Sequence, residues 1–311
     1  MFRLVEKRRW YFLISASIII PGLIAMIYST ATTGLPFKLA IDFTGGSIWK
    51  LSFDVPVQPA DVRQVFVDAG YGDTAVTTLG DGRTAQVRLK DIDETEKLAL
   101  TDALKARFGQ NVAEEQFSAV GPAIGREVTQ AATFAVLAAS VVILIFMIIA
   151  FRKVVRPFRY GVAAIIAVLH DLLLTLGIFS ILSLVFGWEA DALFLTALLT
   201  VISFSMQDKI VVFDRIRENS PKYRGESFST IADRSVMETI HRSLATQLCA
   251  IFMMVAILLF GGGTIKQFIA IMLVGLASGT YSSIFTAVPI LVGWEEGDLL
   301  GRKAAVKPQP A

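Results

Sequence analysis

Six long apolar runs divide the chain, and each is long enough to cross a membrane. They cover residues 10–28, 129–151, 160–186, 192–213, 243–260 and 267–293. About 20 apolar residues in a helix span ~30 Å of hydrocarbon. The pattern therefore predicts an α-helical membrane protein with six transmembrane helices. The first run is longer than the apolar core of a typical signal peptide and lacks a clear cleavage site, so we interpret it as a retained span.

Residues 30–128 differ in kind from the six runs. They contain 10 Lys or Arg and 14 Asp or Glu, with turn-forming residues throughout. Gly80-Asp81-Gly82 between two β-rich runs is typical of a hairpin. The patterns predict, in order, strand 39–53, helix 59–69, strand 74–79, strand 84–89, helix 94–108 and strand 112–120. This βαββαβ order predicts an α+β domain of ferredoxin-like type.

Composition agrees with a polytopic membrane protein. Of the 311 residues, 54% are hydrophobic and only 18% are charged. The net charge of +2 gives no case for nucleic acid binding. The single Cys249 excludes an internal disulfide framework, and two histidines are too few to suggest a metal centre. We find no nucleotide loop or catalytic triad, so we expect neither an enzyme nor a bound cofactor.

The distribution of Lys and Arg predicts the orientation. Four segments on one side of the membrane hold 17 of these residues, and they are 1–9, 152–159, 214–242 and 294–311. The short loops on the opposite side hold only Lys266. By the positive-inside rule both termini are cytoplasmic, and the domain at 30–128 is extracytoplasmic. The expected parts are an N-terminus with the first span (1–29), the domain (30–128), a five-helix bundle (129–293) with a cytoplasmic loop (214–242), and a tail (294–311).

Three of the spans carry polar residues at depth. These are His170 and Asp171 in the third, Asp208 and Lys209 in the fourth, and Arg242 and Thr246 in the fifth. A charge within a span costs about 2.5–3.5 kcal/mol on insertion scales, so such residues are functional-site candidates. Asp208 lies about 10 Å inside the cytoplasmic Arg215, at 1.5 Å per helical residue. Arg242 enters from the same side and is long enough to reach it, and Thr246 shares its face.

An Asp208–Arg242 pair admits two interpretations, and the residues alone leave both open. It is either a static ion pair between helices or a carboxylate that exchanges a proton, because arginine does not deprotonate in proteins. His170 and Asp171 fit either a helix–helix hydrogen bond or a proton relay. Lys209 has three options, which are snorkelling, pairing with Asp208 and pairing with Asp171.

Two further patterns concern helix packing. Gly275 and Gly279 form a GxxxG motif in the last span, which predicts close packing against a helix that the sequence does not identify. Residues 225–241 are typical of an amphipathic surface helix leading into the fifth span.

Several motifs stand in consistent order along nearly the whole chain. They contain Asp42, Gly45 and Gly46; Gly121, Pro122 and Gly125; His170 and Asp171; Asp208, Asp214 and Arg215; Arg242 and Thr246; and Gly279. These motifs resemble those of the SecF family, membrane subunits of the SecDF accessory complex of bacterial protein export that are related to the RND superfamily. The resemblance departs at Gln207 and Lys209, where the family usually has Asn and Thr.

The resemblance implies a multi-pass subunit of the cytoplasmic membrane that uses the proton-motive force to assist late protein export. Asp208 would accept the proton and Arg242 would be its switching partner. The implied partners are a SecD homologue as the other six-helix half, the SecYEG channel and unfolded secretory proteins. Protons are the expected coupling ion, with sodium not excluded. The alternatives are a non-conducting scaffold of the translocon and, less favoured by the single small external domain, half of an RND-type small-molecule exporter.

Overall fold

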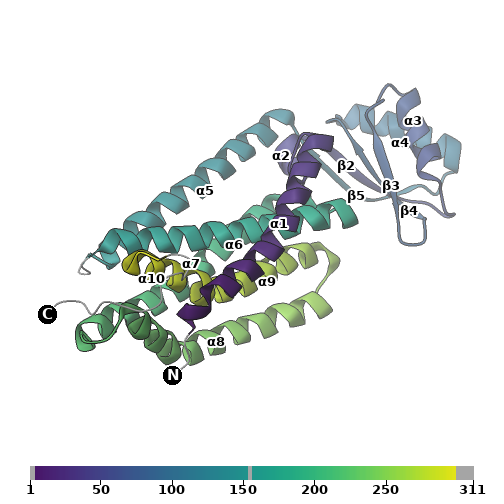
Figure 1. Cartoon of the computed structure of the whole chain (residues 1–311). Helices are drawn as coiled ribbons and strands as arrows, with labels where there is room; N and C mark the ends of the chain where they lie inside the picture. The colour runs from purple at the N-terminus through teal and green to yellow at the C-terminus, as the bar shows by residue number, and fades with distance from the viewer. Residues whose placement is uncertain (1–3, 153–155, 299–311) are drawn as a thin grey trace. The chain divides into compact units, whose positions relative to one another are not determined.

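The computed structural model describes residues 4–152 and 156–298, and its long helices coincide with the six apolar runs (Figure 1). Each is long and apolar enough to span a membrane, which confirms the predicted fold class. A 3-10 turn, η1 (Val5–Lys7), precedes the first helix. The spans are α1 (Arg8–Thr33), α5 (Pro122–Ala150), α6 (Pro157–Phe186), α7 (Ala192–Lys222), α8 (Phe228–Phe260), and α9 (Gly263–Ser282) continued by η2 (Ser283–Ala287) and α10 (Val288–Glu296).

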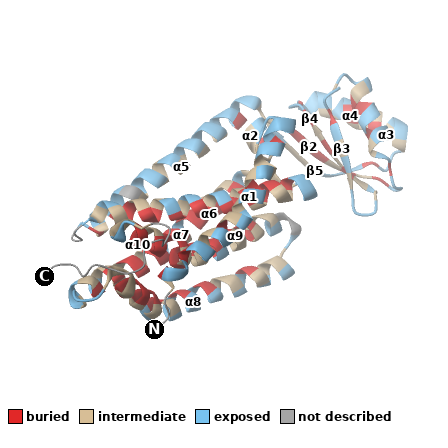
Figure 2. Cartoon of the chain, viewed as in Figure 1, coloured by how far each residue is buried: buried red, intermediate tan, exposed pale blue. Residues whose placement is uncertain are grey.

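The helices of the bundle differ in how deeply they are buried. Buried residues concentrate on α6, α7 and the last span, whereas α5 and α8 are mostly exposed along their apolar faces (Figure 2). Helix α7 contacts α6, α8 and α9, and α6 also contacts α1 and α9. The polar residues predicted at depth on α6 and α7 therefore lie at the centre of the bundle.

Glycines allow three of these helices to approach their neighbours closely. A Cβ atom at Gly177 of α6 would lie 2.8 Å from the Cα atom of Gly22 of α1. A side chain at Gly275 or Gly279 of α9 would meet α7, and a Cβ at Gly279 would lie 3.1 Å from the Cα of Ser205. Small residues at helix contacts are the usual means of close packing in membranes. The partner of the GxxxG motif is therefore α7 of the same chain.

The last span contains a π-helical segment, η2, directly after Ser282. Such segments are rare and occur mostly within α-helices, frequently at functional sites. Ser283, Ile284 and Ala287 in this segment are buried, so the irregular turn lies inside the bundle.

The second compact unit, Leu39–Phe134, carries a four-stranded antiparallel sheet. The strand order is β3-β4-β2-β5, with Trp49 of β2 opposite both Val87 of β4 and Phe117 of β5. Its elements follow the predicted βαββαβ order. They are β2 (Gly46–Ser52), α3 (Pro59–Asp68), β3 (Ala75–Leu79), β4 (Thr84–Leu89), α4 (Glu94–Phe108) and β5 (Ala113–Val120).

This unit has a hydrophobic core of its own. Trp49 and Leu51 of β2, Phe66 of α3, Val87 of β4 and Leu104 of α4 are at most 1% exposed. Fully burying a large apolar side chain contributes roughly 1.5–3 kcal/mol. The two helices therefore pack on the sheet through the alternate positions that the strand pattern marks as apolar.

The predicted strand 39–53 was wrong in its first part. After the short β1 (Lys38–Leu39), residues Ile41–Thr44 form a helical turn, α2. Gly45 and Gly46 follow with φ of 71° and 117°, a region that favours glycine. The chain therefore reverses before β2 begins, and the apolar run 39–53 is not one strand.

Other predicted boundaries also shift. Helix α1 continues to Thr33, because the first helix-ending glycine is Gly34 with φ of 80°, so the predicted domain start at 30 was too early. The predicted loop 214–242 is largely helical, and the predicted surface helix 225–241 is the first part of α8. A two-residue strand, β6 (Glu189–Ala190), lies between α6 and α7. Of the predicted tail, residues 299–311 lie outside the described residues.

Helix α4 begins with a capping box that should make its stability pH-dependent. The Asp93 carboxylate accepts from the N–H of Glu96 at 2.8 Å, and the Glu96 carboxylate accepts from the N–H of Asp93 at 2.9 Å. The Thr95 hydroxyl and the Glu96 N–H lower the pKa of Asp93. The capping contribution is therefore complete above the ordinary aspartate pKa of about 3.9 and is lost as the pH falls through the lowered value.

We predict that Asp93→Ala raises amide exchange in the first turn of α4 about fivefold at pH 7, the size of a typical lost N-cap. Hydrogen–deuterium exchange of the full chain, corrected for intrinsic rates, measures this. Asp102→Ala on the exposed side of the same helix is the control and should change little. A difference between Asp93→Ala and wild type that persists undiminished at pH 2 would contradict the assigned cause.

The contact between α1 and α6 gives a second prediction. Gly177→Ala should lower the thermal unfolding midpoint of the chain in lipid nanodiscs, because the new Cβ meets backbone atoms of Gly22 that cannot move independently. Overpacking of this kind costs about 1–3 kcal/mol. Gly225→Ala is the matched control, since a Cβ there has no atom within 4 Å. An unchanged midpoint for Gly177→Ala would mean that the two helices separate without cost.

Candidate functional site

The polar centre of the bundle is the fully buried carboxylate of Asp171, near the midpoint of α6. Ser205 of α7 and Ser282 of α9 each donate a hydroxyl hydrogen bond to its Oδ2 atom at 2.6 Å. Ser278 of α9 donates to Oδ1 at 2.7 Å. One carboxylate therefore connects three helices.

Lys209 of α7 supplies the opposite charge. Its Nζ lies 2.9 Å from Asp171 Oδ2, and its side chain is fully buried. The ammonium also donates to the backbone oxygen of Ser205 and to the hydroxyl of Ser282, both at 3.0 Å. Of the three options that the sequence left open for Lys209, the structure selects pairing with Asp171.

This ion pair is tolerated because its polar atoms are satisfied. Moving a carboxylate or an ammonium out of water costs several kcal/mol per ion, which attraction offsets only when the remaining donors and acceptors also find partners. Asp171 Oδ2 accepts from two hydroxyls and the ammonium, and Oδ1 accepts from a third hydroxyl. Removing one member alone is expected to cost roughly 3–5 kcal/mol, because the other charge is left buried without a partner.

His170 lies at the edge of this cluster. Its Nδ1 is 3.1 Å from Asp171 Oδ1, and its ring stacks on Tyr281 with 6.4 Å between centroids. Its Nε2 is buried without a hydrogen-bond partner among the described residues. One interpretation of His170 and Asp171 was a hydrogen bond between helices. Asp171 makes such bonds, to serines of α7 and α9.

Asp208 precedes Lys209 but contacts α8 instead of α6. It is 4% exposed, and its Oδ2 accepts a hydrogen bond from Nε2 of Gln247 at 2.7 Å. Within residues 4–152 and 156–298 the structure records no basic group within 4.0 Å of it. Asp208 is thus a buried carboxylate with an amide partner and no ion-pair partner in the described part of the chain.

The predicted Asp208–Arg242 ion pair does not form in this structure. Arg242 and Thr246 do share a face of α8, where the Thr246 hydroxyl donates to the Arg242 carbonyl at 3.0 Å, but both residues are exposed. Ser243 and Gln247 are the buried residues of this stretch. Successive helix positions lie about 100° apart, so the face toward α7 is the neighbouring one. The helix that contacts Asp208 is therefore α8, as predicted, but the contact is made by Gln247, on the face next to that of Arg242 and Thr246.

Four residues of the site were not predicted from the sequence, namely Ser205, Ser278, Ser282 and Gln247. A signal for three of them was present. Ser205 is four residues from Lys209, and Ser278 is four residues from Ser282, so each pair shares one helix face. Small polar residues at this spacing in an apolar helix indicate a contact between helices. Gln247 carried no signal beyond its position one residue after Thr246.

Two motifs of the family resemblance meet within the second compact unit, Leu39–Phe134. A Cβ at Gly45 would lie 2.8 Å from Pro122 Cα, and a Cβ at Gly125 would lie 2.7 Å from the backbone nitrogen of Gly45. The turn after α2 and the first turn of α5 therefore pack backbone against backbone, which side chains at either glycine would prevent. The same two segments carry Asp42, Gly46 and Gly121.

The charged C-terminal end of α7 forms an ion pair with α8. Arg215 forms ion pairs with Glu218 at 2.7 Å and with Glu238 of α8. Asp214 pairs with Arg217 at 2.6 Å. These side chains are partly exposed, and such pairs contribute about 0–1 kcal/mol each. They are typical of a helix end at an aqueous border.

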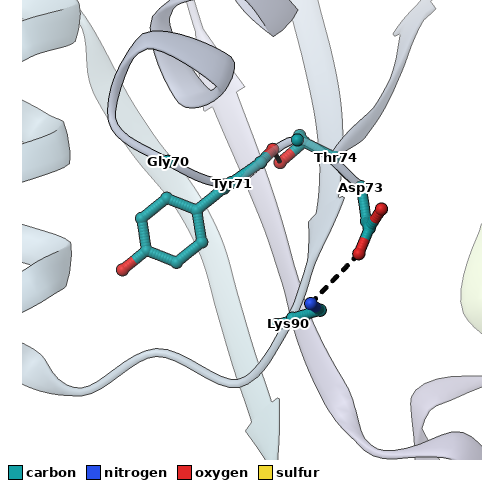
Figure 3. A pocket seen from close by; sticks show the side chains of 6 residues that line it. Gly70, Tyr71, Asp73, Thr74 and Lys90 are labelled. Carbon is teal, nitrogen blue, oxygen red and sulfur yellow. Dashed lines mark hydrogen bonds and ion pairs between the residues drawn. The ribbon is translucent and has the colours of Figure 1, made fainter.

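The second compact unit also has a small surface pocket beside the loop between α3 and β3 (Figure 3). The ion pair Lys90–Asp73 at 3.0 Å lies in it, and its side chains are 76% and 79% exposed. Such an exposed pair contributes little to stability, about 0–1 kcal/mol. The pocket offers polar surface without an arrangement of nucleophile and base. It is lined by Gly70, Tyr71, Gly72, Asp73, Thr74 and Lys90.

No group of three or more His, Cys, Asp and Glu side chains is placed to hold a metal ion in the described part of the chain. The oxygen atoms gathered at Asp171 surround the Lys209 ammonium. The distinctive chemistry of the bundle is therefore one satisfied ion pair beside one carboxylate, Asp208, that has no ion-pair partner within 4.0 Å in the described part of the chain.

Comparison with known proteins identifies relatives along the whole chain. The family described as protein export membrane protein SecD/SecF, C-terminal, matches residues 100–297. The protein translocase subunit SecF of Anaerolinea thermophila is 48% identical over 302 residues, which cover 96% of each chain. The SecF subunit of Thermobaculum terrenum is 46% identical over 322 aligned residues, covering 100% of this chain and 99% of the relative.

Solved structures agree with these sequences. A crystal structure of SecDF from Thermus thermophilus, described as a translocon-associated membrane protein, matches 95% of this chain with a TM-score of 0.76 and 30% identity. A structure of SecDF in a Super-membrane-facing form matches with a TM-score of 0.65 and 28% identity. The chain spans 39% of the length of each of these SecDF chains. Its sequence relatives and its fold together place this chain in the SecF family of protein translocase subunits.

Proposed function

We propose that this chain is half of a SecDF-type complex that uses the proton-motive force to assist protein export, with Asp208 as the proton-carrying group. The observation that carries the proposal is the environment of Asp208. It is a buried carboxylate in a transmembrane helix with an amide as its hydrogen-bond partner. A purely structural acid at this depth would be expected to have a cation beside it, as Asp171 has.

Gln247 suits both protonation states of Asp208. Its amide N–H donates to the ionised carboxylate at 2.7 Å, and a side-chain amide also carries an acceptor oxygen for a carboxylic acid proton. A charge that crosses ~100 mV releases about 2.3 kcal/mol, enough to bias a two-state bundle. Proton binding at Asp208 therefore provides a way for the membrane potential to act on α7 and α8.

Arg242 would be the partner of Asp208 in the alternative state. It lies on α8, the helix that carries Gln247, and on the face adjacent to it. A rotation of α8 by about one residue's 100° would exchange these two faces. Asp208 would then be ionised when paired with Arg242 and free to take a proton when it contacts Gln247.

The partners follow from the length of the relatives. This chain corresponds to 39% of a SecDF chain, so the remaining part of such a complex would come from a SecD homologue. SecYEG and unfolded secretory proteins would be the further partners. With the termini cytoplasmic, as Lys and Arg predict, the unit at 39–134 is on the outer side, where an exported chain emerges.

The test is export of a precursor protein into membrane vesicles that contain this chain with its SecD partner and SecYEG. We predict that Asp208→Asn abolishes the stimulation by an imposed proton gradient, lowering export at least tenfold toward the level without a gradient. Gln247→Leu should retain stimulation with an altered pH dependence, because the carboxylate remains. Imposed sodium gradients in the same vesicles identify the coupling ion.

Glu226→Gln is the control for loss of a carboxylate, since Glu226 forms a partly exposed ion pair with Arg234 far from the buried acids in the sequence. It should export as wild type does. If Asp208→Asn supports gradient-stimulated export and proton flux as well as wild type does, the chain acts as a scaffold and the motor role is wrong.

A further inference from the structure

Four oxygen atoms surround the Lys209 ammonium. Nζ is surrounded by Asp171 Oδ2 at 2.9 Å, the Ser205 carbonyl oxygen at 3.0 Å, the Ser205 hydroxyl at 2.5 Å and the Ser282 hydroxyl at 3.0 Å. These are one carboxylate, one carbonyl and two hydroxyl oxygens. Backbone carbonyls and similar oxygen donors coordinate sodium and potassium ions within membrane proteins.

Burial and charge balance favour the same interpretation. Asp171, Lys209, Ser205 and Ser282 are each at most 1% exposed, so water does not compensate either charge. The other carboxylate oxygen, Oδ1, is already occupied by the Ser278 hydroxyl and by His170. If the ammonium were absent, the four oxygens around its position would hold one uncompensated negative charge.

We propose that Lys209 is a tethered cation that occupies a monovalent-cation site built by Asp171, Ser205 and Ser282, and that it closes this site to free sodium and potassium. The ammonium satisfies the oxygens as a bound ion would, but its side chain prevents it from leaving. The site itself does not depend on the proposed role of Asp208. If that role holds, the tether leaves Asp208 as the exchangeable carboxylate of the pair of acids.

The test opens the site and asks whether an ion enters. Lys209→Ala removes the ammonium and leaves space, whereas Lys209→Met removes the charge but fills most of the same volume. Wild type and both variants are extracted and placed in lipid nanodiscs in sodium, potassium or choline chloride at equal ionic strength. Thermal unfolding midpoints and binding of radioactive sodium or of rubidium as a potassium substitute are then measured.

We expect the midpoint of Lys209→Ala to be several degrees higher in sodium or potassium than in choline, because an ion bound to the folded state stabilises it by mass action. For wild type and for Lys209→Met, the unfolding midpoint of each protein should be the same in all three salts. Binding of about one ion per chain should occur only in Lys209→Ala. The double variant Lys209→Ala with Asp171→Asn should lose both the shift and the binding.

Two outcomes would overturn the proposal. One is a Lys209→Ala midpoint that is the same in choline and in alkali salts, which would mean that a proton neutralises Asp171. The other is a shift that survives Asp171→Asn, which would place the ion elsewhere. If Lys209→Ala is recovered in none of the salts, while Lys209→Met with Asp171→Asn folds, a free cation cannot replace the ammonium and the proposal also fails. Recovery in alkali salts alone would support it.

Discussion

The bundle depends on one constraint, which is that a charge in hydrocarbon must be compensated where it lies. Asp171 meets this constraint through Lys209 and three serine hydroxyls that come from α7 and α9. Each of these groups needs the others as partners, so the network links three helices through one carboxylate. Close packing of α9 on α7 accompanies this network, since a Cβ at Gly279 would lie 3.1 Å from the Cα of Ser205.

Adjacent residues on α7 meet the constraint in different ways. Lys209 contacts Asp171 of α6, whereas Asp208 contacts Gln247 of α8. The difference of about 100° between neighbouring helix positions is enough to place them in separate environments. One side of α7 is thus held by an ion pair that resists change. The other side carries an acid whose only described side-chain partner is a neutral amide.

The sequence predicted the six spans, the βαββαβ order and the depth of Asp171, Asp208 and Lys209, because these follow from hydropathy and from local patterns. It did not predict which acid Lys209 would choose. That choice depends on the rotation of α7 against α6, which is set by contacts far apart in the chain. The Asp208–Arg242 ion pair was predicted wrongly for the same reason. The i, i+4 spacing shows which residues share a face of α8, but it does not show which face is buried against α7.

The proposed two-state cycle would need both a rigid and an adjustable element, and Lys209 and Asp208 would provide them on neighbouring faces of α7. If Asp208 were paired as tightly as Asp171, changing its protonation state would cost several kcal/mol. One charge that crosses ~100 mV supplies about 2.3 kcal/mol, which is less than that cost. If Asp171 were as lightly partnered as Asp208, two buried acids would compete for the same ion. Because the Lys209 ammonium pairs with Asp171, the two acids do not share one cation, and Asp208 is the acid that the proposed proton step would use.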